Sequence, residues 1–296
     1  MTLYKNPPSW WDMGNGLNIS IFSKALYSNW CYARSYQTLF DCGEGCATSI
    51  GNYLAGIEHV FIGHDHGDHV LGLPALIGAR NAGRGISRNE DTMDGNKPLT
   101  VYYPDDNYLM IDLIDFIKKR NGNWLRYDLQ FVPIMPGYEV QLGKNAYVRA
   151  FKMSHQKNKN TLGYVIYENR TRLKAEYKGI DVPALFRAGL SREEFVAKYQ
   201  EQYRANLFAY CLDAYRIDDY REIAGCNDVI MDCTFLNDKD RDDVTHFTLD
   251  EACRVCNGNG VKNMYAAHLS GRYNYNDAAK DYPNIKFINP FKVNEL

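Results

Sequence analysis

The stretch His64-Asp-His66-Gly-Asp68-His69 constrains this chain more than any other part of its sequence. Three of the seven histidines in 296 residues fall within these six positions. A short apolar run at 59–62 precedes the stretch and predicts a buried strand. Side chains at alternate positions point the same way, so the first two histidines can chelate one cation while Asp68 and His69, beyond the glycine, face a second. The pattern predicts a site for two metal ions at the end of a strand.

Other candidate ligands occur singly, each directly after an apolar run that predicts a strand. They are His155, Asp213 and His268. We expect two sets of ligands that share Asp213 as a bridge: His64, His66, His155 and Asp213 around one ion, and Asp68, His69, Asp213 and His268 around the other. Imidazole and carboxylate donors suit zinc, manganese or iron.

The rest of the chain predicts a mixture of strands and helices. Alternating or apolar runs predict strands at 17–21, 36–40, 59–62, 99–103, 138–142, 147–151, 163–167, 207–212, 229–231 and 264–267. Helical spacing of apolar residues predicts helices at 47–54, 71–79, 105–119, 191–206 and 248–257. No repeat or linker divides the chain, so we expect one α/β (α+β) domain over 1–296, with a surface loop or lid at 81–98.

Composition narrows the functional classes. The 34 Lys and Arg residues nearly balance the 36 Asp and Glu residues, which argues against a strongly basic face for nucleic acid. No apolar run approaches the roughly 20 residues that span a bilayer, and the first residues lack the pattern of a signal peptide. Eight scattered cysteines are typical of reduced thiols. We therefore expect a cytoplasmic protein without a membrane partner.

Three segments together resemble a known enzyme superfamily. They are Phe61-Ile-Gly-His64 through Leu73-Pro74, the upstream Leu39-Phe-Asp41-Cys-Gly-Glu-Gly45, and the downstream His268-Leu-Ser270-Gly-Arg272-Tyr273. The combination is similar to the metallo-β-lactamase superfamily, in particular its ribonuclease Z branch, over nearly the whole chain. The resemblance implies a four-layer αββα metallo-β-lactamase sandwich, a binuclear phosphodiesterase with two divalent ions (zinc, with manganese as the alternative), and a homodimer.

Two further segments resemble catalytic elements of the ribonuclease Z branch. Asp228-Val-Ile-Met-Asp232-Cys-Thr234 is similar to a segment in which the family has Glu at the place of Asp232, and Thr245-His246-Phe-Thr248 contains the family's leaving-group histidine. This implies that Asp68 ligates a metal and orients the attacking water. It also implies that His246, oriented by Asp232, protonates the departing 3′-oxygen and leaves a 5′-phosphate.

The segment 168–206 suggests which phosphodiester is cleaved. Ribonuclease Z enzymes clamp the tRNA elbow with a basic arm in this interval. Here eight Lys and Arg residues face six acids, and Arg192 to Arg204 reads as an ordinary amphipathic helix. We therefore expect an insertion that replaces the arm and a small substrate. In this respect the chain resembles phage anti-Pycsar proteins, which hydrolyse cyclic CMP and cyclic UMP to 5′-nucleotides to evade bacterial immunity. Cyclic AMP and cyclic GMP are further candidates, and the place of action would be the host bacterial cytoplasm.

Two alternatives remain open from the sequence. The first is a tRNA 3′-end processing endonuclease, a ribonuclease Z proper, with tRNA as its partner. In that case the region from Arg170 to Asn206 would project as an arm instead of packing on the body. The second is a sponge that binds nucleotides without hydrolysing them. Product formation would separate hydrolysis from binding.

Overall fold

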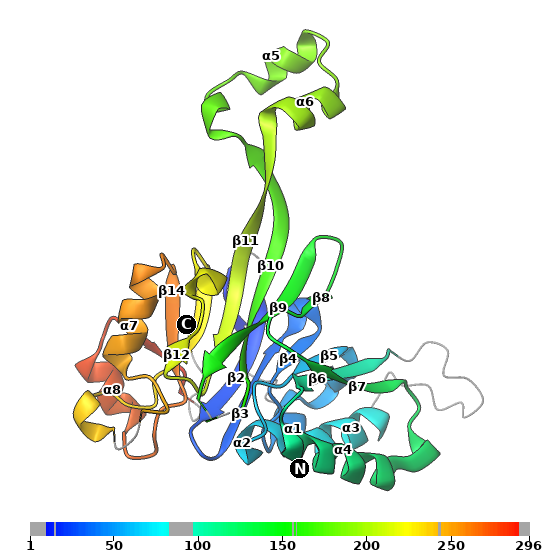
Figure 1. Ribbon diagram of the computed structural model, residues 1–296, viewed down its shortest axis with the longest axis vertical. Helices are drawn as coiled ribbons and strands as arrows, with labels where there is room; N and C mark the ends of the chain where they lie inside the picture. Colours follow the sequence, from blue (N-terminus) through cyan, green and yellow to red (C-terminus); the bar gives the residue numbers. More distant parts are fainter. Residues whose placement is uncertain are drawn as a thin grey trace, which may run out of the picture.

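The computed structural model describes residues 10–14, 16–82, 97–155, 157, 159–241 and 244–289. Two β-sheets pack face to face within the described part of the chain (Figure 1). The first contains, in spatial order, β1 (Trp11–Asp12), β2 (Asn18–Lys24), β3 (Ser28–Ala33), β4 (Thr38–Phe40), β5 (His59–Phe61), β6 (Leu99–Pro104) and β7 (Leu129–Ile134). The second contains β12 (Arg216–Ile217), β9 (Ala146–Ser154), β10 (Thr161–Leu173), β11 (Gln200–Cys211), β13 (Asp228–Asp232), β14 (Asn263–Ala267) and β15 (Lys286–Phe287), with β8 (Glu139–Gln141) paired to β9.

Helices cover the outer face of each sheet. The short α1 (Cys46–Ile50) and α2 (Gly67–Val70) and the longer α3 (Leu73–Ala82) and α4 (Tyr108–Asn121) accompany the first sheet, and α7 (Leu249–Gly258) and α8 (Tyr275–Asp281) accompany the second (Figure 1). Met110, Ile114 and Ile117 recur at helical spacing on the buried side of α4. Between the sheets lies an aromatic core that includes Phe40 and Tyr210, whose ring centroids are 5.5 Å apart. The four-layer αββα sandwich is confirmed.

Parallel strands bring the ends of distant segments to one edge. In the first sheet β4, β5 and β6 run parallel, and in the second β11, β13 and β14 run parallel. The loops that follow parallel strands lie at the same edge of a sheet. All candidate ligands except His155 follow β5, β11 or β14, so the topology brings those of each sheet to one edge before any side-chain contact is considered.

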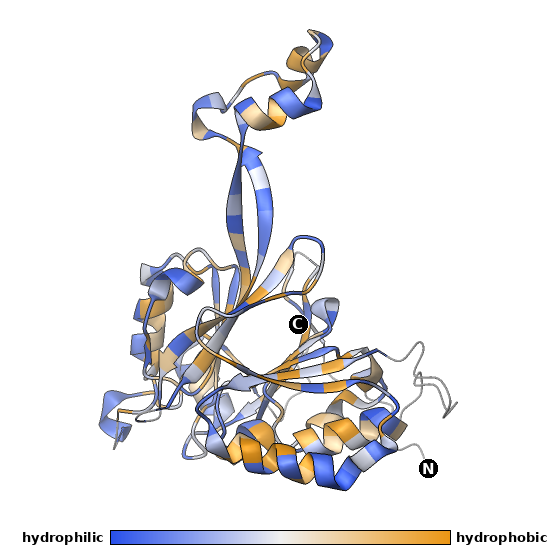
Figure 2. Ribbon diagram, turned by 45° about the vertical axis from the view of Figure 1, so that its right-hand side comes forward, coloured by the Kyte–Doolittle hydropathy of each residue, from blue (hydrophilic) through white to orange (hydrophobic). Residues whose placement is uncertain are grey.

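The segment 168–206 projects from the body as an arm, contrary to the expectation that it replaces one. The strands β10 and β11 pair antiparallel beyond the sheet as far as Leu173 and Gln200, and α5 (Val182–Arg187) and α6 (Arg192–Tyr199) lie at their far end (Figure 1). Figure 2 shows that the two strands of the stem are largely hydrophilic. The predicted helix over 191–206 is therefore correct only as far as Tyr199.

The error in this helix has a physical cause. Phe195, Tyr199 and Tyr203 recur every four residues, which fits one face of a helix, but four is also a multiple of two and fits one face of a strand. Strand pairing decides the outcome after Tyr199, because Tyr203 is opposite Arg170 and also stacks under the guanidinium of Arg172 at 4.7 Å.

The other organisational expectations have mixed outcomes. Of the predicted loop or lid at 81–98, residues 83–96 lie outside the described residues, and residues 81 and 82 end α3. All eight cysteines are free thiols. None of the helices in the described ranges is long and apolar enough to cross a bilayer.

Candidate metal centre

The seven predicted ligands come from four places in the chain and meet at one edge of the sandwich. His64 and His66 follow β5, Asp68 and His69 lie in α2, and the remaining three each follow a strand: His155 after β9, Asp213 after β11 and His268 after β14. Three groups of side chains bring their donor atoms within 4.8 Å of one another: His64, His66, His155 and Asp213; Asp68, His69 and His268; and Asp213, Asp232, His246 and His268. The first group is the set expected from the sequence.

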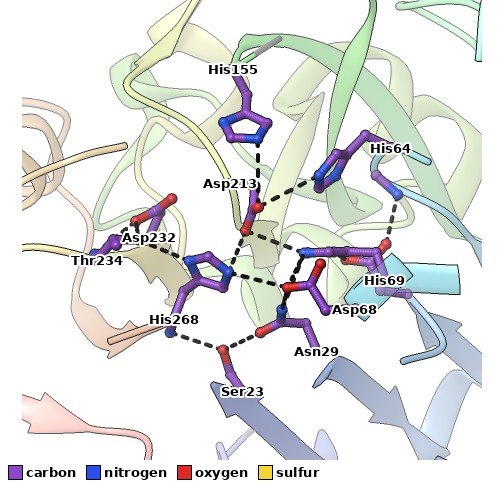
Figure 3. A network of polar contacts seen from close by, with 12 residues as sticks. Ser23, Asn29, His64, Asp68, His69, His155, Asp213, Asp232, Thr234 and His268 are labelled. Atoms are coloured by element: carbon purple, nitrogen blue, oxygen red, sulfur yellow. Dashed lines mark hydrogen bonds and ion pairs between the residues drawn. The ribbon is translucent and has the colours of Figure 1, made fainter. Parts of the chain in front are cut away.

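Asp213 lies at the centre of this arrangement (Figure 3). Its Oδ2 is 3.5 Å from His64 Nε2 and 3.7 Å from His155 Nε2. Its Oδ1 is 3.3 Å from His69 Nε2 and 2.8 Å from His268 Nε2. Each carboxylate oxygen thus faces a different pair of imidazoles, which is the disposition that a bridging ligand needs.

Two of the histidines are held by hydrogen bonds on the ring nitrogen that faces away from Asp213. His155 Nδ1 donates to the carbonyl oxygen of Thr245 over 2.9 Å. His69 Nδ1 donates to Asp41 Oδ2 over 2.7 Å. Such partners fix the tautomer and leave the Nε2 lone pair for a metal ion, as is usual for metal-ligating histidines.

Asp41 is a site residue to which the sequence assigned no role, although its motif was recognised. Its carboxylate is buried and accepts hydrogen bonds from the backbone nitrogen of Gly63 at 2.7 Å and from the Tyr210 hydroxyl at 3.0 Å, as well as from His69. Three donors hold this carboxylate in place, so it orients His69 firmly. The signal for this role was its position in the motif that precedes the histidine stretch.

The donor set fits a divalent cation. Both ring nitrogens of His64 and the Nε2 of His155 are buried and lack a hydrogen-bond partner among the described residues. A buried polar atom without a partner is costly unless a ligand satisfies it. Imidazole and carboxylate donors around one carboxylate are the combination that zinc and similar ions prefer. We conclude that the cluster is a divalent-metal site.

The electrostatics of the cluster agree with this conclusion. Burial, with the neighbouring His69, lowers the pKa of His64 well below its usual value, so this ring is neutral and can act as a ligand. Burial also disfavours a charged Asp213, but the attraction of His268 and His69 outweighs it and holds the pKa of Asp213 well below its usual value. Asp213 is therefore an anion that attracts positive charge to the centre of the cluster.

His246 and Asp232 form a pair beside the cluster, as expected. His246 Nδ1 lies 2.8 Å from Asp232 Oδ2, so the shorter side chain that replaces Glu still reaches the imidazole. The other oxygen of Asp232 accepts from the Thr234 hydroxyl, which in turn accepts from His268 Nδ1, both over 2.8 Å. One carboxylate thus orients two histidines, and Thr234 is a further site residue without an assigned role in the sequence.

The backbone is strained where three site residues leave their strands. Asp41, Asp213 and His268 have φ values of 55°, 53° and 61°, in the left-handed region that is unfavourable for residues with a Cβ. After these turns, Asp213 and His268 lie in the cluster and Asp41 contacts His69. Such strain is commonly found at functional sites, where the surrounding structure maintains it.

Comparison with known proteins identifies relatives over most of the chain. Over 262 residues the chain is 30% identical to a ribonuclease Z of Halorubrum lacusprofundi, a match that covers 80% of this chain and 78% of the relative. It is 27% identical over 267 residues to a ribonuclease Z of Listeria monocytogenes, covering 82% and 81% of the two chains. No protein-family model matches the chain.

Solved structures share the fold. The short form of human tRNase Z has a TM-score of 0.59 at 18% identity, covering 86% of this chain and 93% of that one. The metallo-β-lactamase fold protein YhfI from Bacillus subtilis has a TM-score of 0.61 at 14% identity, covering 93% and 98%. Zn²⁺-bound PqqB from Methylobacterium extorquens has a TM-score of 0.54 at 12% identity, covering 88% and 85%. The metallo-β-lactamase fold is therefore confirmed.

These findings correct the expected substrate. The interpretation of the chain as a cyclic-nucleotide phosphodiesterase that evades Pycsar immunity is wrong, because the curated relatives are ribonucleases Z. The interpretation depended on the absence of an arm, and the β10–β11 hairpin is an arm. The arm was not predicted from the sequence, because its stem is built from polar residues with neither marked basicity nor a glycine-proline signature.

Proposed function

This chain belongs to the ribonuclease Z family, and we propose that this metal-dependent hydrolase is an endonuclease that processes the 3′ end of tRNA precursors. The observation that carries the proposal is the projecting arm formed by β10, β11, α5 and α6 (Figure 1). A hydrolase of small phosphodiesters needs only the metal centre. An arm that extends far from that centre is suited to a substrate large enough to contact both.

We infer that the centre holds two zinc ions. His64, His66 and His155 would hold one ion, Asp68, His69 and His268 would hold the other, and Asp213 would bridge them; the two separate groups of donors support this number. When bound, two such ions lower the pKa of a water molecule and neutralise charge on the scissile phosphate. The remaining steps belong to side chains of this chain.

Asp68 and His246 are the residues to which we assign proton handling. Asp68 would accept a hydrogen bond from the attacking water and orient it toward phosphorus. His246 Nδ1 is bound to Asp232 Oδ2, which leaves Nε2 free to donate a proton to the departing 3′-oxygen. Water oxygen then bonds to phosphorus as the bond to the 3′-oxygen breaks, which gives a 3′-hydroxyl on the tRNA and a 5′-phosphate on the trailer.

The protonation state of His246 supports its role as the acid. Burial lowers the pKa of this imidazole, but the negative charge of Asp232 and its hydrogen bond outweigh burial and raise the pKa above the usual value. The side chain remains 16% exposed, so a substrate atom can reach it. A raised pKa keeps the proton available for donation near neutral pH.

The arm would contact the tRNA at a distance from the cleaved bond. Its stem arginines are engaged within the arm or with the body: Arg170 with Glu168, Arg172 with Glu201 and Arg204 with Glu222. Little unpaired positive charge is left on the stem, so we propose that affinity depends on shape and on the helices at the tip more than on a large number of phosphate contacts.

We further propose that the protein is a homodimer. The family resemblance suggests it, and several apolar side chains of α4 are exposed, namely Tyr108, Leu109, Ile111 and Phe116. Large apolar side chains that are exposed on one helix can mark a surface that a partner covers, although the exposed Asp112 and Asp115 lie among them. A second copy of the chain is the partner that we expect.

The proposed reaction is tested with a tRNA precursor that carries a 3′ trailer. We expect the zinc-loaded protein to release the trailer with a 5′-phosphate, detected on denaturing gels and by mass spectrometry. Asp68→Ala should retain the fold and lose activity. His246→Ala should retain metal and lose about a hundredfold or more in kcat. A precursor that stays intact with zinc and with manganese would contradict the proposal.

A further inference from the structure

A buried polar pair lies behind the metal centre, in the hairpin of β2 and β3. Ser23 and Asn29 face each other across the two strands, and both are fully buried. The Ser23 hydroxyl donates to Asn29 Oδ1 over 2.7 Å. Burying two polar side chains inside a β-sandwich is unfavourable unless their hydrogen bonds are satisfied. The partners that satisfy them are parts of the metal centre.

The direction of each hydrogen bond follows from its neighbours (Figure 3). The backbone nitrogen of His268 donates to Ser23 Oγ over 2.9 Å, so the hydroxyl hydrogen is directed to Asn29 Oδ1. The amide nitrogen of Asn29 must then face the other way. It lies 3.0 Å from Asp68 Oδ2 and 3.1 Å from His69 Nε2. The pair thus connects Asp68 with His268, which lies 200 positions later in the chain.

The backbone around Asn29 is equally constrained. Its carbonyl oxygen accepts from the backbone nitrogen of Gly43 over 3.0 Å. A Cβ at Gly43 would lie 2.3 Å from the carbonyl oxygen of Asp68 and 2.6 Å from the backbone nitrogen of Asn29. No side chain fits there, so the strand that carries Asn29 and the helix that carries Asp68 both pack against the backbone of Gly43. This packing fixes the backbone of Asn29, and the hydrogen bonds to Ser23 and Asp68 fix its amide.

We propose that Asn29, oriented by Ser23, is a positioning residue that holds the carboxylate of Asp68 in the orientation required by the cation of the Asp68, His69 and His268 group. The inference rests on the two-ion centre of the proposed function. An amide nitrogen has no lone pair to give to a metal, so Asn29 is not a ligand. It donates to the carboxylate of Asp68 without adding charge, and it faces the ring nitrogen of His69 that would bind the ion.

The proposal is tested by measuring how many zinc ions Asn29→Ala binds and with what affinity. Zinc is titrated in competition with a chromophoric chelator, and Co²⁺ absorption reports the ligand geometry. The wild type should bind two equivalents. Asn29→Ala should keep the first equivalent, at His64, His66, His155 and Asp213, and bind the second about tenfold or more weakly with an altered cobalt spectrum. Two equivalents with unchanged affinity and spectrum would overturn the proposal.

A matched control separates positioning from general loss of stability. Asn121 is also a buried asparagine, and its amide donates to the Ile117 carbonyl in α4, away from the centre. Asn121→Ala should lower the unfolding temperature and leave both zinc equivalents unchanged. If Asn121→Ala weakens the second equivalent as much as Asn29→Ala does, the positioning role is refuted.

Ser23→Ala provides a second variant that leaves the amide in place. It should weaken the second equivalent less than Asn29→Ala does, because the amide still donates to Asp68. A loss as large as that of Asn29→Ala would show that the contact of Ser23 with the His268 backbone, and not the amide of Asn29, positions this group. A wild type that binds one ion only would overturn the two-ion centre and this role with it. A wild type that binds two ions but leaves tRNA precursor intact would refute the proposed reaction alone.

Discussion

Strained backbone at single residues positions two of the seven proposed ligands of this centre. His268 and Asp213 turn sharply after β14 and β11, with φ values of 61° and 53°. A residue with a Cβ in this region costs about 1–2 kcal/mol relative to an ordinary conformation, whereas glycine adopts it freely. The chain keeps a histidine and an aspartate at these positions, and the strain shows that their side chains contribute more than local stability.

At most positions a glycine variant is less stable than an alanine variant, and the strain at His268 predicts the reverse order. In metal-free protein, His268→Gly should be more stable than His268→Ala by about 1 kcal/mol, because glycine relieves the left-handed conformation. Chemical denaturation in the presence of a chelator measures the difference. As a control, Ala266→Gly in β14, a buried residue whose φ is not positive, should be less stable than the native protein. Equal stabilities of the two His268 variants would contradict the account of strain.

The pair of Asp232 and His246 predicts a change in pH dependence. Asp213, Asp232, His155 and His268 all influence or contact His246, and the charge of Asp232 is the main reason why the pKa of His246 is raised. The acid form carries the proton, so kcat should be constant below this pKa and fall above it. Asp232→Asn removes the charge, lowers the pKa, and should move the alkaline fall in kcat to lower pH. Rates measured from about pH 5.5 to 9 test this, and an unmoved alkaline fall would exclude Asp232 as the orienting charge.

At the scale of elements, the arm is the part of the molecule with the clearest separate role. Its stem is a two-stranded ribbon that continues β10 and β11 beyond the body, and its tip consists of two short helices. The helix α6 begins with a capping box of Ser191 and Glu194, and Phe186 and Phe195 pack at 5.1 Å between ring centroids. The tip therefore has its own small core, and it can be removed without opening the sandwich.

We expect removal of the tip to weaken the binding of large substrates only. Leu173 and Gln200 are paired across the stem, so residues 174–199 can be replaced by an Asn-Gly turn. The shortened protein should bind two zinc ions and hydrolyse a small phosphodiester at the native rate, while KM for the tRNA precursor rises about tenfold or more. Steady-state kinetics on both substrates measure the split. An unchanged KM for the precursor would refute the arm as a tRNA contact.

The elements also show what could and could not be predicted from this sequence. Strand ends before His155, Asp213 and His268 were predictable, because short apolar runs end there and parallel topology gathers such ends. The first forty residues were expected to form strands, but β3 received no bounds of its own, because Ser28 and Asn29 interrupt its apolar pattern. The burial of these two residues depends on contacts with distant residues. For the same reason no local signal marked Asn29 or Ser23 as part of the centre. The roles of the seven ligands stay a prediction until metal binding is measured.

At the scale of the whole molecule, the exposed face of α4 predicts self-association. The protein should sediment as a dimer of the 34.0 kDa chain at micromolar concentration. Phe116→Glu should shift it toward the monomer, because a charge on this face would be buried without a partner. Val196→Glu, on the exposed tip of the arm, is the matched control and should leave the mass unchanged. A monomer at all concentrations would refute the dimer.

The centre has a further consequence for how the molecule holds together. His64, His66, Asp68 and His69 belong to one half of the sandwich, whereas His155, Asp213 and His268 belong to the other. Ions bound between them would stabilise the packing of the two halves, because the free energy of metal binding must be lost before the halves can separate. In a cell with little zinc, metal-free molecules would be inactive and also less stable at the interface between the two halves. We expect proteases to degrade these molecules first.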